Sequence, residues 1–198
     1  MDEDRKKYKI FVEDKKFYLG RIAVSDGRFS SVDLERELGD EALFSGEEDF
    51  LLPGLIDIHF HGCLGKDFCD GTREAVSTLA KYEAEHGITG ICPATLTLPV
   101  EELEKVLGLA RTYRDEGLKI GEARLLGINM EGPFISPVKK GAQNPNYILK
   151  WDDRIANRFL EVSGGLVKYM GIAPEENPAF KEFIPKIQGK VRISLAHT

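Results

Sequence analysis

From residue 50 onward, short apolar segments alternate with longer amphipathic segments. The apolar segments are FLLPGLIDIHF, TGICPATL, ARLLGINMEG, LVKYMGIAP and VRISLAHT. Short, mostly apolar runs of this kind favour strands that are covered on both faces. The segments between them carry the spacing of amphipathic helices. Strict alternation predicts an α/β fold with a parallel sheet, because parallel neighbours need a crossover connection.

Capping residues mark the ends of the expected helices. The helix TREAVSTLAKYEAEHG ends at Gly87, a favourable C-terminal cap, and PVEELEKVLGLARTYRDEG has Pro99 near its first turn. Asp152 or Asp153 can cap a helix over DDRIANRFLEVSGG, and NPAFKEFIPKIQGK predicts a weaker helix. We interpret His86, beside Gly87, as a C-terminal contact favoured by the helix dipole.

Histidines and one acid follow the apolar segments. PGLIDIHFHG places His59 and His61 one residue apart, and alternate side chains of an extended strand share a face. Glu131 ends the third predicted strand and His197 ends the fifth. Imidazoles and a carboxylate suit zinc, iron or manganese, and a catalytic metal keeps one position open. We therefore expect these four side chains to converge on a divalent cation.

Alternation alone fits both a doubly wound sheet and a (β/α)₈ barrel. The residues suited to chemistry lie at the ends of several strands, as in barrel enzymes. HGCLGKDFCDG, after the first strand, has neither the GxGxxG nor the Walker spacing. We therefore predict a TIM-type barrel over residues 50–198, with about five βα units. A closed barrel needs about 200 to 250 residues, so we expect an incomplete barrel and an N-terminal fragment.

Residues 1–49 have a different texture, with short alternating strands at YKIFV, KFYLG and RIAVSDGRFSSV. The Asp26-Gly27 pair predicts a hairpin turn, because both residues tolerate positive φ values. The result is a small antiparallel β unit of roughly 45 residues, too small to be stable without a neighbour.

Composition excludes several classes. A net charge of -6 without a basic stripe argues against a nucleic-acid binder, and no apolar run reaches the ~20 residues of a membrane span. The charged start MDEDRKKYKI lacks a secretory signal. Cys63, Cys69 and Cys92 are unrelated in spacing, which predicts no disulfide framework and a cytoplasmic location. Cys63 and Cys69 could join a metal site, although buried thiols are favoured.

Two stretches carry a resemblance to a known family. PGLIDIHFHG resembles the first-strand signature of the amidohydrolase superfamily, and GINMEGPFISPVKKGAQNPNY is similar to the signature of the N-acetylglucosamine-6-phosphate deacetylase family. The resemblance implies hydrolysis of an acetamide, giving glucosamine 6-phosphate and acetate. It also implies one or two divalent metal ions per subunit, a homodimer at full length, and a β-sandwich whose first part is residues 1–49.

The resemblance also implies roles for particular residues. Glu131 is the acidic metal ligand, His197 is the first of two later histidine ligands, and the HxH pair before them allows a second ion. Ala142 and Gln143 fall where the family contacts the sugar phosphate, and the catalytic aspartate is expected beyond Thr198. Lys139 and Lys140 are interpreted as a solvated basic pair rather than a phosphate clamp.

Two alternatives stay open. A dihydroorotase-like enzyme of the same superfamily typically uses a carboxylated lysine as the bridging ligand, whereas the candidate here is Glu131. The other alternative is a non-catalytic, truncated remnant. An open parallel sheet also has unpaired edges, so we expect the isolated chain to associate or aggregate.

Overall fold

The computed structural model describes residues 6–117 and 119–198. Residues 1–5, at the start of the expected N-terminal portion, lie outside the described residues. The chain divides into two compact units, Met1–Pro53 and Gly54–Thr198. The larger unit holds the main hydrophobic core and every candidate site residue.

The first unit is a four-stranded sheet in the order β3-β2-β1-β4. Its elements are β1 (Tyr8–Phe11), β2 (Phe17–Ser25), β3 (Arg28–Glu37), the short helix α1 (Asp40–Leu43) and β4 (Asp49–Leu51). The first three strands are antiparallel, and β4 runs parallel to β1. Asp26 and Gly27 have φ values of 53° and 72°, which confirms the predicted hairpin turn between β2 and β3.

FLLPGLIDIHF does not form one strand, so this prediction was wrong. β4 ends at Leu51 and pairs with β1 in the first unit, whereas β5 (Leu55–Asp57) pairs with β8 in the second. Pro53 lies between them. Proline has no N–H to donate and a fixed φ, so the pairing pattern does not continue through it.

The second unit contains two parallel sheets, β10-β8-β5 and β13-β12-β11-β9, and a small antiparallel hairpin. Its strands are β5, the hairpin strands β6 (Gly62–Cys63) and β7 (Lys66–Asp67), β8 (Ile88–Ile91), β9 (Ala94–Thr95), β10 (Arg124–Leu125), β11 (Ile128–Phe134), β12 (Val167–Ile172) and β13 (Arg192–Leu195). The parallel pairing confirms the α/β class predicted from alternation.

TGICPATL and ARLLGINMEG are each interrupted, which the sequence pattern did not predict. Pro93, without an N–H, separates β8 from β9. Leu126 donates its backbone N–H to Ile91, while Ile128 donates to Leu166, so the third strand changes partners between β10 and β11. With each interrupted pair counted as one strand and the β6-β7 hairpin set aside, every strand of the two parallel sheets is parallel to the one before it in the chain. This sequential order is the order that a barrel requires.

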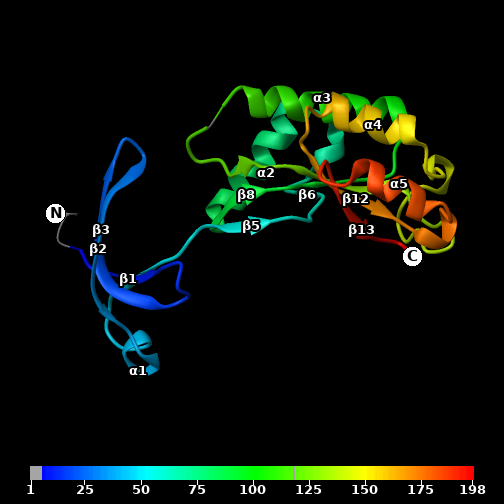
Figure 1. Ribbon diagram of the computed structural model, residues 1–198. Helices are drawn as coiled ribbons and strands as arrows, with labels where there is room; N and C mark the ends of the chain where they lie inside the picture. The colour runs from blue at the N-terminus through cyan, green and yellow to red at the C-terminus, as the bar shows by residue number, and fades with distance from the viewer. Residues whose placement is uncertain (1–5, 118) are drawn as a thin grey trace. The chain divides into compact units, whose positions relative to one another are not determined.

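Four helices connect these strands, and α2, α3 and α4 lie on one side of them (Figure 1). The helices are α2 (Arg73–Glu85), α3 (Val100–Asp115), α4 (Asp153–Val162) and α5 (Phe180–Ile187), with 3₁₀ turns at Phe68–Asp70, Pro145–Tyr147 and Pro174–Glu176. The predicted caps are confirmed: the Asp152 side chain accepts from the backbone N–H groups of Arg154 and Ile155, and Gly87 follows α2 with φ 82°.

The core of the second unit lies between the helices and the strands. Its largest fully buried side chains include Phe68, Phe134 and Phe159. Trp151, the only tryptophan of the sequence, stacks on Phe183 with ring centroids 4.0 Å apart and an interplanar angle of 8°. This stack joins the loop before α4 to α5 and so fixes the C-terminal part of the unit.

The cysteines contribute to packing. All three are free thiols, and Cys69 Sγ accepts a hydrogen bond from the Leu96 backbone N–H at 3.1 Å. Burial raises the pKa of the Cys69 thiol to about 12, so it remains protonated at neutral pH. Among the described residues, no helix has the length and apolar character needed to cross a membrane.

Candidate metal centre

His59 and His61 lie in the segment between β5 and β6. We predicted that they lie on a strand, and this prediction was wrong. The backbone N–H of His59 donates to Oδ1 of Asp57 at 2.8 Å, a local turn that ends β5. The segment still runs beside β9, because the Ala94 N–H donates to the Phe60 carbonyl at 2.7 Å. This position brings both imidazoles to the same side, with ring centroids 5.4 Å apart.

Glu131 lies within β11 and does not end it, which corrects the expected position. The strand continues to Phe134 and passes close to the segment that contains the buried Thr97. A Cβ at Gly132 would lie 2.1 Å from Oγ1 of Thr97. Glycine at this position therefore lets the two segments approach. The Glu131 side chain is only 14% exposed, so its charge needs partners within the protein.

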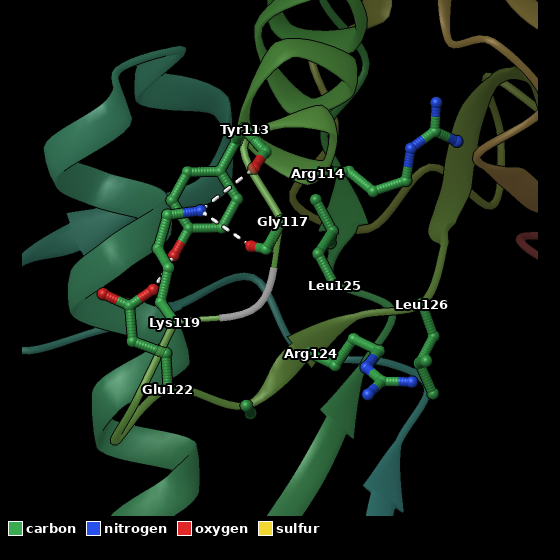
Figure 2. A pocket seen from close by; sticks show the side chains of 9 residues that line it. Tyr113, Arg114, Gly117, Lys119, Glu122, Arg124, Leu125 and Leu126 are labelled. Carbon is green, nitrogen blue, oxygen red and sulfur yellow. Dashed lines mark hydrogen bonds between the residues drawn. The ribbon is translucent and has the colours of Figure 1, made fainter. Parts of the chain in front are cut away.

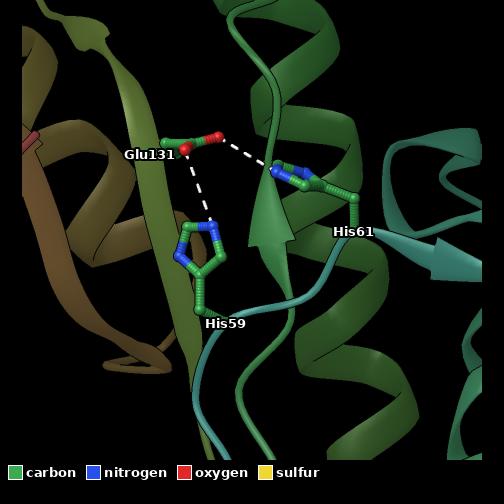
Figure 3. A group of neighbouring side chains, drawn as sticks. All are labelled: His59, His61 and Glu131. Carbon is green, nitrogen blue, oxygen red and sulfur yellow. Dashed lines mark ion pairs between the residues drawn. The ribbon is translucent and has the colours of Figure 1, made fainter. Parts of the chain in front are cut away.

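Figure 3 shows the two imidazoles pointing at the Glu131 carboxylate. His61 Nε2 lies 3.0 Å from Oε2, and His59 Nε2 lies 3.5 Å from Oε1. One ligand atom from each of the three side chains lies within 4.8 Å of the others. The three residues therefore form a group of the size that can hold a metal ion.

His197 reaches the same carboxylate from the segment after β13. Its Nε2 lies 3.1 Å from Glu131 Oε1, and its Nδ1 lies 2.9 Å from the Lys139 carbonyl oxygen. His197 has φ 50°, and its carbonyl accepts from the Ser136 N–H at 3.1 Å. The structure thus brings all four predicted ligands together at one carboxylate, with His197 outside the three-residue group.

Hydrogen bonds from the imidazoles shift the pKa values of this site. The hydrogen bond from His61 is the largest cause that lowers the pKa of Glu131 to about 2, and His197 adds to it. The same hydrogen bond raises the pKa of His61 above its usual value. The carboxylate is therefore ionised at neutral pH and attracts positive charge.

The His197 tautomer indicates that a cation fits between the ring and Glu131. A carbonyl oxygen only accepts, so Nδ1 carries a proton toward Lys139, and Nε2 is the ring nitrogen that faces Glu131. Nε2 lies 3.1 Å from the lone pairs of Oε1, a distance at which a proton or a metal ion lies between the two atoms. The donor set therefore fits a divalent metal.

The residues expected at the sugar phosphate occupy different environments. Gln143 is 4% exposed, and its Nε2 donates to Glu131 Oε2 at 2.7 Å, whereas Ala142 is exposed. Lys139 is also exposed, and the Lys140 ammonium donates to the Gly141 carbonyl at 3.1 Å. His86 contacts the Tyr82 carbonyl through Nδ1 at 2.7 Å and is the C-cap of α2, as predicted.

One supporting residue, Asn129, was not predicted from the sequence. Asn129 donates through Nδ2 to the Ile58 carbonyl at 2.9 Å and contacts His59 Nδ1 at 3.2 Å. A signal for Asn129 existed, because it precedes Glu131 by two positions and so shares its face of the strand. The contact between Gln143 and Glu131 had no such signal, because it depends on the path of an irregular loop.

A separate pocket of about 420 Å³ lies beside the end of α3 and β10 and contains none of the predicted site residues (Figure 2). There the Lys119 ammonium lies 3.7 Å from the centroid of the Tyr113 ring and donates to the Tyr113 carbonyl. The Tyr113 hydroxyl donates to Glu122, and burial raises the pKa of Tyr113. These groups satisfy one another, so their contacts hold Lys119 and Glu122 against Tyr113 of α3.

Comparison with known proteins identifies the family. Residues 50–189 match the Amidohydrolase family. The chain belongs to the amidohydrolase family. This match includes the HxH segment and Glu131 and ends before His197.

Individual relatives of this amidohydrolase chain are deacetylases. It is 32% identical over 193 residues to N-acetylglucosamine-6-phosphate deacetylase of Bacillus subtilis (strain 168), covering 96% of this chain and 48% of the relative. It is 28% identical over 153 residues to N-acetylgalactosamine-6-phosphate deacetylase of Escherichia coli O157:H7, covering 77% and 40%. The chain thus spans about half the length, or less, of these curated relatives.

Solved structures share the fold. N-acetyl-D-glucosamine-6-phosphate deacetylase from Mycobacterium smegmatis matches with a TM-score of 0.76 at 20% identity, over 96% of this chain and 50% of that one. The deacetylase from Thermotoga maritima matches with a TM-score of 0.75 at 22% identity, over 96% and 47%. At these identities the likeness establishes the fold.

Proposed function

We propose that this chain forms the metal-binding part of an N-acetylglucosamine-6-phosphate deacetylase. The reaction is hydrolysis of the acetamide to glucosamine 6-phosphate and acetate, within amino-sugar metabolism. The observation that carries the proposal is that Glu131 contacts imidazoles that come from both ends of the parallel strand series. The family membership and the names of the relatives support the same reaction.

The proposal extends to the fold. The strands of residues 50–198 are the first five of a (β/α)₈ barrel, and residues 1–49 are one part of a β-sandwich domain. The sequential parallel order of the strands supports the barrel, and the length of the relatives leaves room for its remaining strands. An apolar pocket of about 500 Å³ on the first unit, lined by Phe11, Phe29 and Leu51 among others, supports a sandwich, whose inner face must be covered.

Glu131, His59, His61 and His197 would hold one or two divalent ions, with zinc, iron or manganese as the candidates. A divalent ion supplies Lewis-acid polarisation of a carbonyl oxygen and lowers the pKa of water. The ionised Glu131 supplies the negative charge of the site. The Lys139 carbonyl keeps the proton of His197 on Nδ1, so that Nε2 faces the centre.

Ala142 and Gln143 are proposed to contact the sugar phosphate. Exposure of Ala142 beside the site supports this role. Gln143 has two amide protons, and one of them is used by Glu131, which leaves the other for a substrate oxygen. Proton transfer to the departing amine is assigned, by the family resemblance, to an aspartate beyond Thr198. The same resemblance adds a homodimer to the proposal, and the cysteine pattern adds a cytoplasmic location.

The test is an assay of the full-length protein with N-acetylglucosamine 6-phosphate and added zinc, iron or manganese. Release of acetate supports the proposal, and no release with any of the three metals overturns it. Dihydroorotate serves as the comparison substrate. The acid at position 131, in contact with three imidazoles, disfavours the dihydroorotase-like alternative.

Metal content separates an enzyme from a non-catalytic remnant. A catalytic zinc normally needs three protein ligands, and the described residues bring together three side chains around one point. Purification without chelator followed by elemental analysis should give close to one ion or two ions per chain. A content below ~0.2 per chain would instead indicate the remnant.

A further inference from the structure

We infer that Gln143 is a positioning residue that fixes the rotation of the Glu131 carboxylate in the metal centre. This inference rests on the proposed function, because it gives Gln143 a part in metal binding. It concerns the amide that faces Glu131 and leaves the substrate contact proposed above in place.

The orientation of the Gln143 amide is determined by its two partners. The buried backbone N–H of Thr97 donates to Gln143 Oε1 at 2.6 Å, so the oxygen of the amide is identified by a group that can only donate. The amide nitrogen must then face the other way, where Nε2 donates to Glu131 Oε2 at 2.7 Å. Gln143 is 4% exposed, so water does not compete effectively for either bond.

This bond distinguishes the two oxygens of Glu131. Oε2 accepts from Gln143 and faces His61, whereas Oε1 faces His59 and His197. The terminal torsion of a glutamate side chain is broad and has no strong intrinsic preference. A fixed donor at Oε2 therefore selects one rotation, in which Oε1 is directed toward the histidines from both ends of the strand series.

The loop that carries Gln143 also holds a second ligand. The Gln143 N–H donates to the Lys140 carbonyl at 3.0 Å, which closes the loop, and the Lys139 carbonyl accepts from His197. At Gly141, where φ is 57°, a Cβ would lie 3.4 Å from Cε1 of His197. One short loop thus orients a carboxylate from β11 and an imidazole that follows β13.

Supporting hydrogen bonds of this kind affect metal affinity. Removal of a group that orients a metal ligand typically weakens metal binding about 10–100-fold. Gln143 is neutral and cannot attract a phosphate by charge, and its amide oxygen and one of its two amide protons are already engaged within the protein. Its effect is therefore expected on the metal first, before any effect on substrate binding.

The test is titration of the metal-free, full-length protein with Co²⁺, followed by the visible spectrum of the bound ion. Gln143→Met keeps the size of the side chain without a donor, and Gln143→Ala removes the side chain. Both should bind Co²⁺ about 10–100-fold more weakly than wild type, with an altered Co²⁺ spectrum. Gln188→Met, at an exposed glutamine after α5, is the matched control and should bind like wild type.

The outcomes separate the two proposals. The positioning role alone would be overturned if wild type binds Co²⁺ and both Gln143 variants bind it with an affinity within twofold of wild type. Circular dichroism must show that both variants are folded. Failure of wild type to bind Co²⁺ would overturn the metal centre and the positioning role with it. Two variants are used because Gln143→Ala opens a gap that Gln143→Met fills, so agreement between them isolates the lost donor.

Discussion

Nε2 of His197 lies 3.1 Å from Oε1 of Glu131, although 66 residues separate them in the chain. The topology explains this contact. Glu131 lies on β11, His197 follows β13, and β12 is the parallel neighbour of both strands. Two parallel crossovers therefore return the chain to the same end of the sheet, where residues from separate strands can share one ion.

Replacement of the carboxylate should abolish the metal centre. Glu131→Gln keeps the shape but removes the charge that the three histidines face. We expect metal affinity to fall by more than ~100-fold, beyond the effect of losing a supporting group. Elemental analysis after dialysis measures the change, with Glu102→Gln on the exposed surface of α3 as the control. Full metal occupancy in Glu131→Gln would contradict the assignment.

The stack of Trp151 on Phe183 should be a main support of α5. Phe183 is 3% exposed, so Phe183→Ala leaves a cavity and should cost about 3–5 kcal/mol in the free energy of unfolding. Trp151 is the only tryptophan, and its emission should shift to the red as its ring gains contact with water. Chemical denaturation followed by fluorescence measures both effects. Phe44→Ala, at a site 83% exposed, should leave both unchanged.

The N-terminus of α2 offers a test of local capping. The Thr72 hydroxyl oxygen accepts from the Ala75 N–H at 3.1 Å. Thr72→Ala should therefore lower the free energy of unfolding by about 1 kcal/mol, which lowers Tm by about 2–4 °C in a chain of this size. The exposed Thr112 lies inside α3, where alanine is a better helix former, so Thr112→Ala should not lower Tm. Equal effects of the two changes, by calorimetry, would argue against the cap.

Cys69 should resist alkylation in the folded protein. Because burial raises the pKa of the thiol to about 12, the reactive thiolate is scarce at pH 8, whereas an unfolded cysteine with a pKa near ~8.5 is partly ionised. Iodoacetamide should label Cys69 quickly only in denaturant, as measured by mass spectrometry of the peptide. Rapid labelling of the native protein would exclude this environment.

The same shift has a consequence for stability. The unfolded chain releases the Cys69 proton above its ordinary pKa, while the folded chain keeps it up to about 12. The unfolded state therefore binds fewer protons between these two values, and stability contributed by this group is full below pH ~8.5 and falls as the pH rises. Cys69→Ala should show a shallower loss of Tm between pH 8 and 10.

Helix ends were predicted well because their signals are local. Gly87 and Asp152 act through hydrogen bonds or backbone angles within a few residues. The strand interruptions were not predicted, since the exchange of partners between β10 and β11 depends on strands distant in sequence. Pro53 and Pro93 could have indicated two of the breaks, because neither can donate to a ladder.

The site shows the same division between pattern and context. Apolar runs followed by His59, Glu131 and His197 predicted that these side chains lie close together, since the ends of parallel strands lie at the same edge of the sheet. The hydrogen bond from Gln143 to Glu131 comes from a loop without periodicity. The direction of the Gln143 amide depends on the Thr97 N–H, which is distant in sequence and donates to Gln143 Oε1.

The chain-order pairing of the parallel strands also bears on synthesis. During translation the N-terminal segments leave the ribosome first, so each new strand emerges when the strand it will pair with is already outside the exit tunnel. With β8 and β9 counted as one strand, no strand of the two parallel sheets has to wait for a later one before it finds a neighbour, although β9 by itself pairs only with β11 among the described strands. Assembly of this unit can therefore keep pace with elongation of the nascent polypeptide.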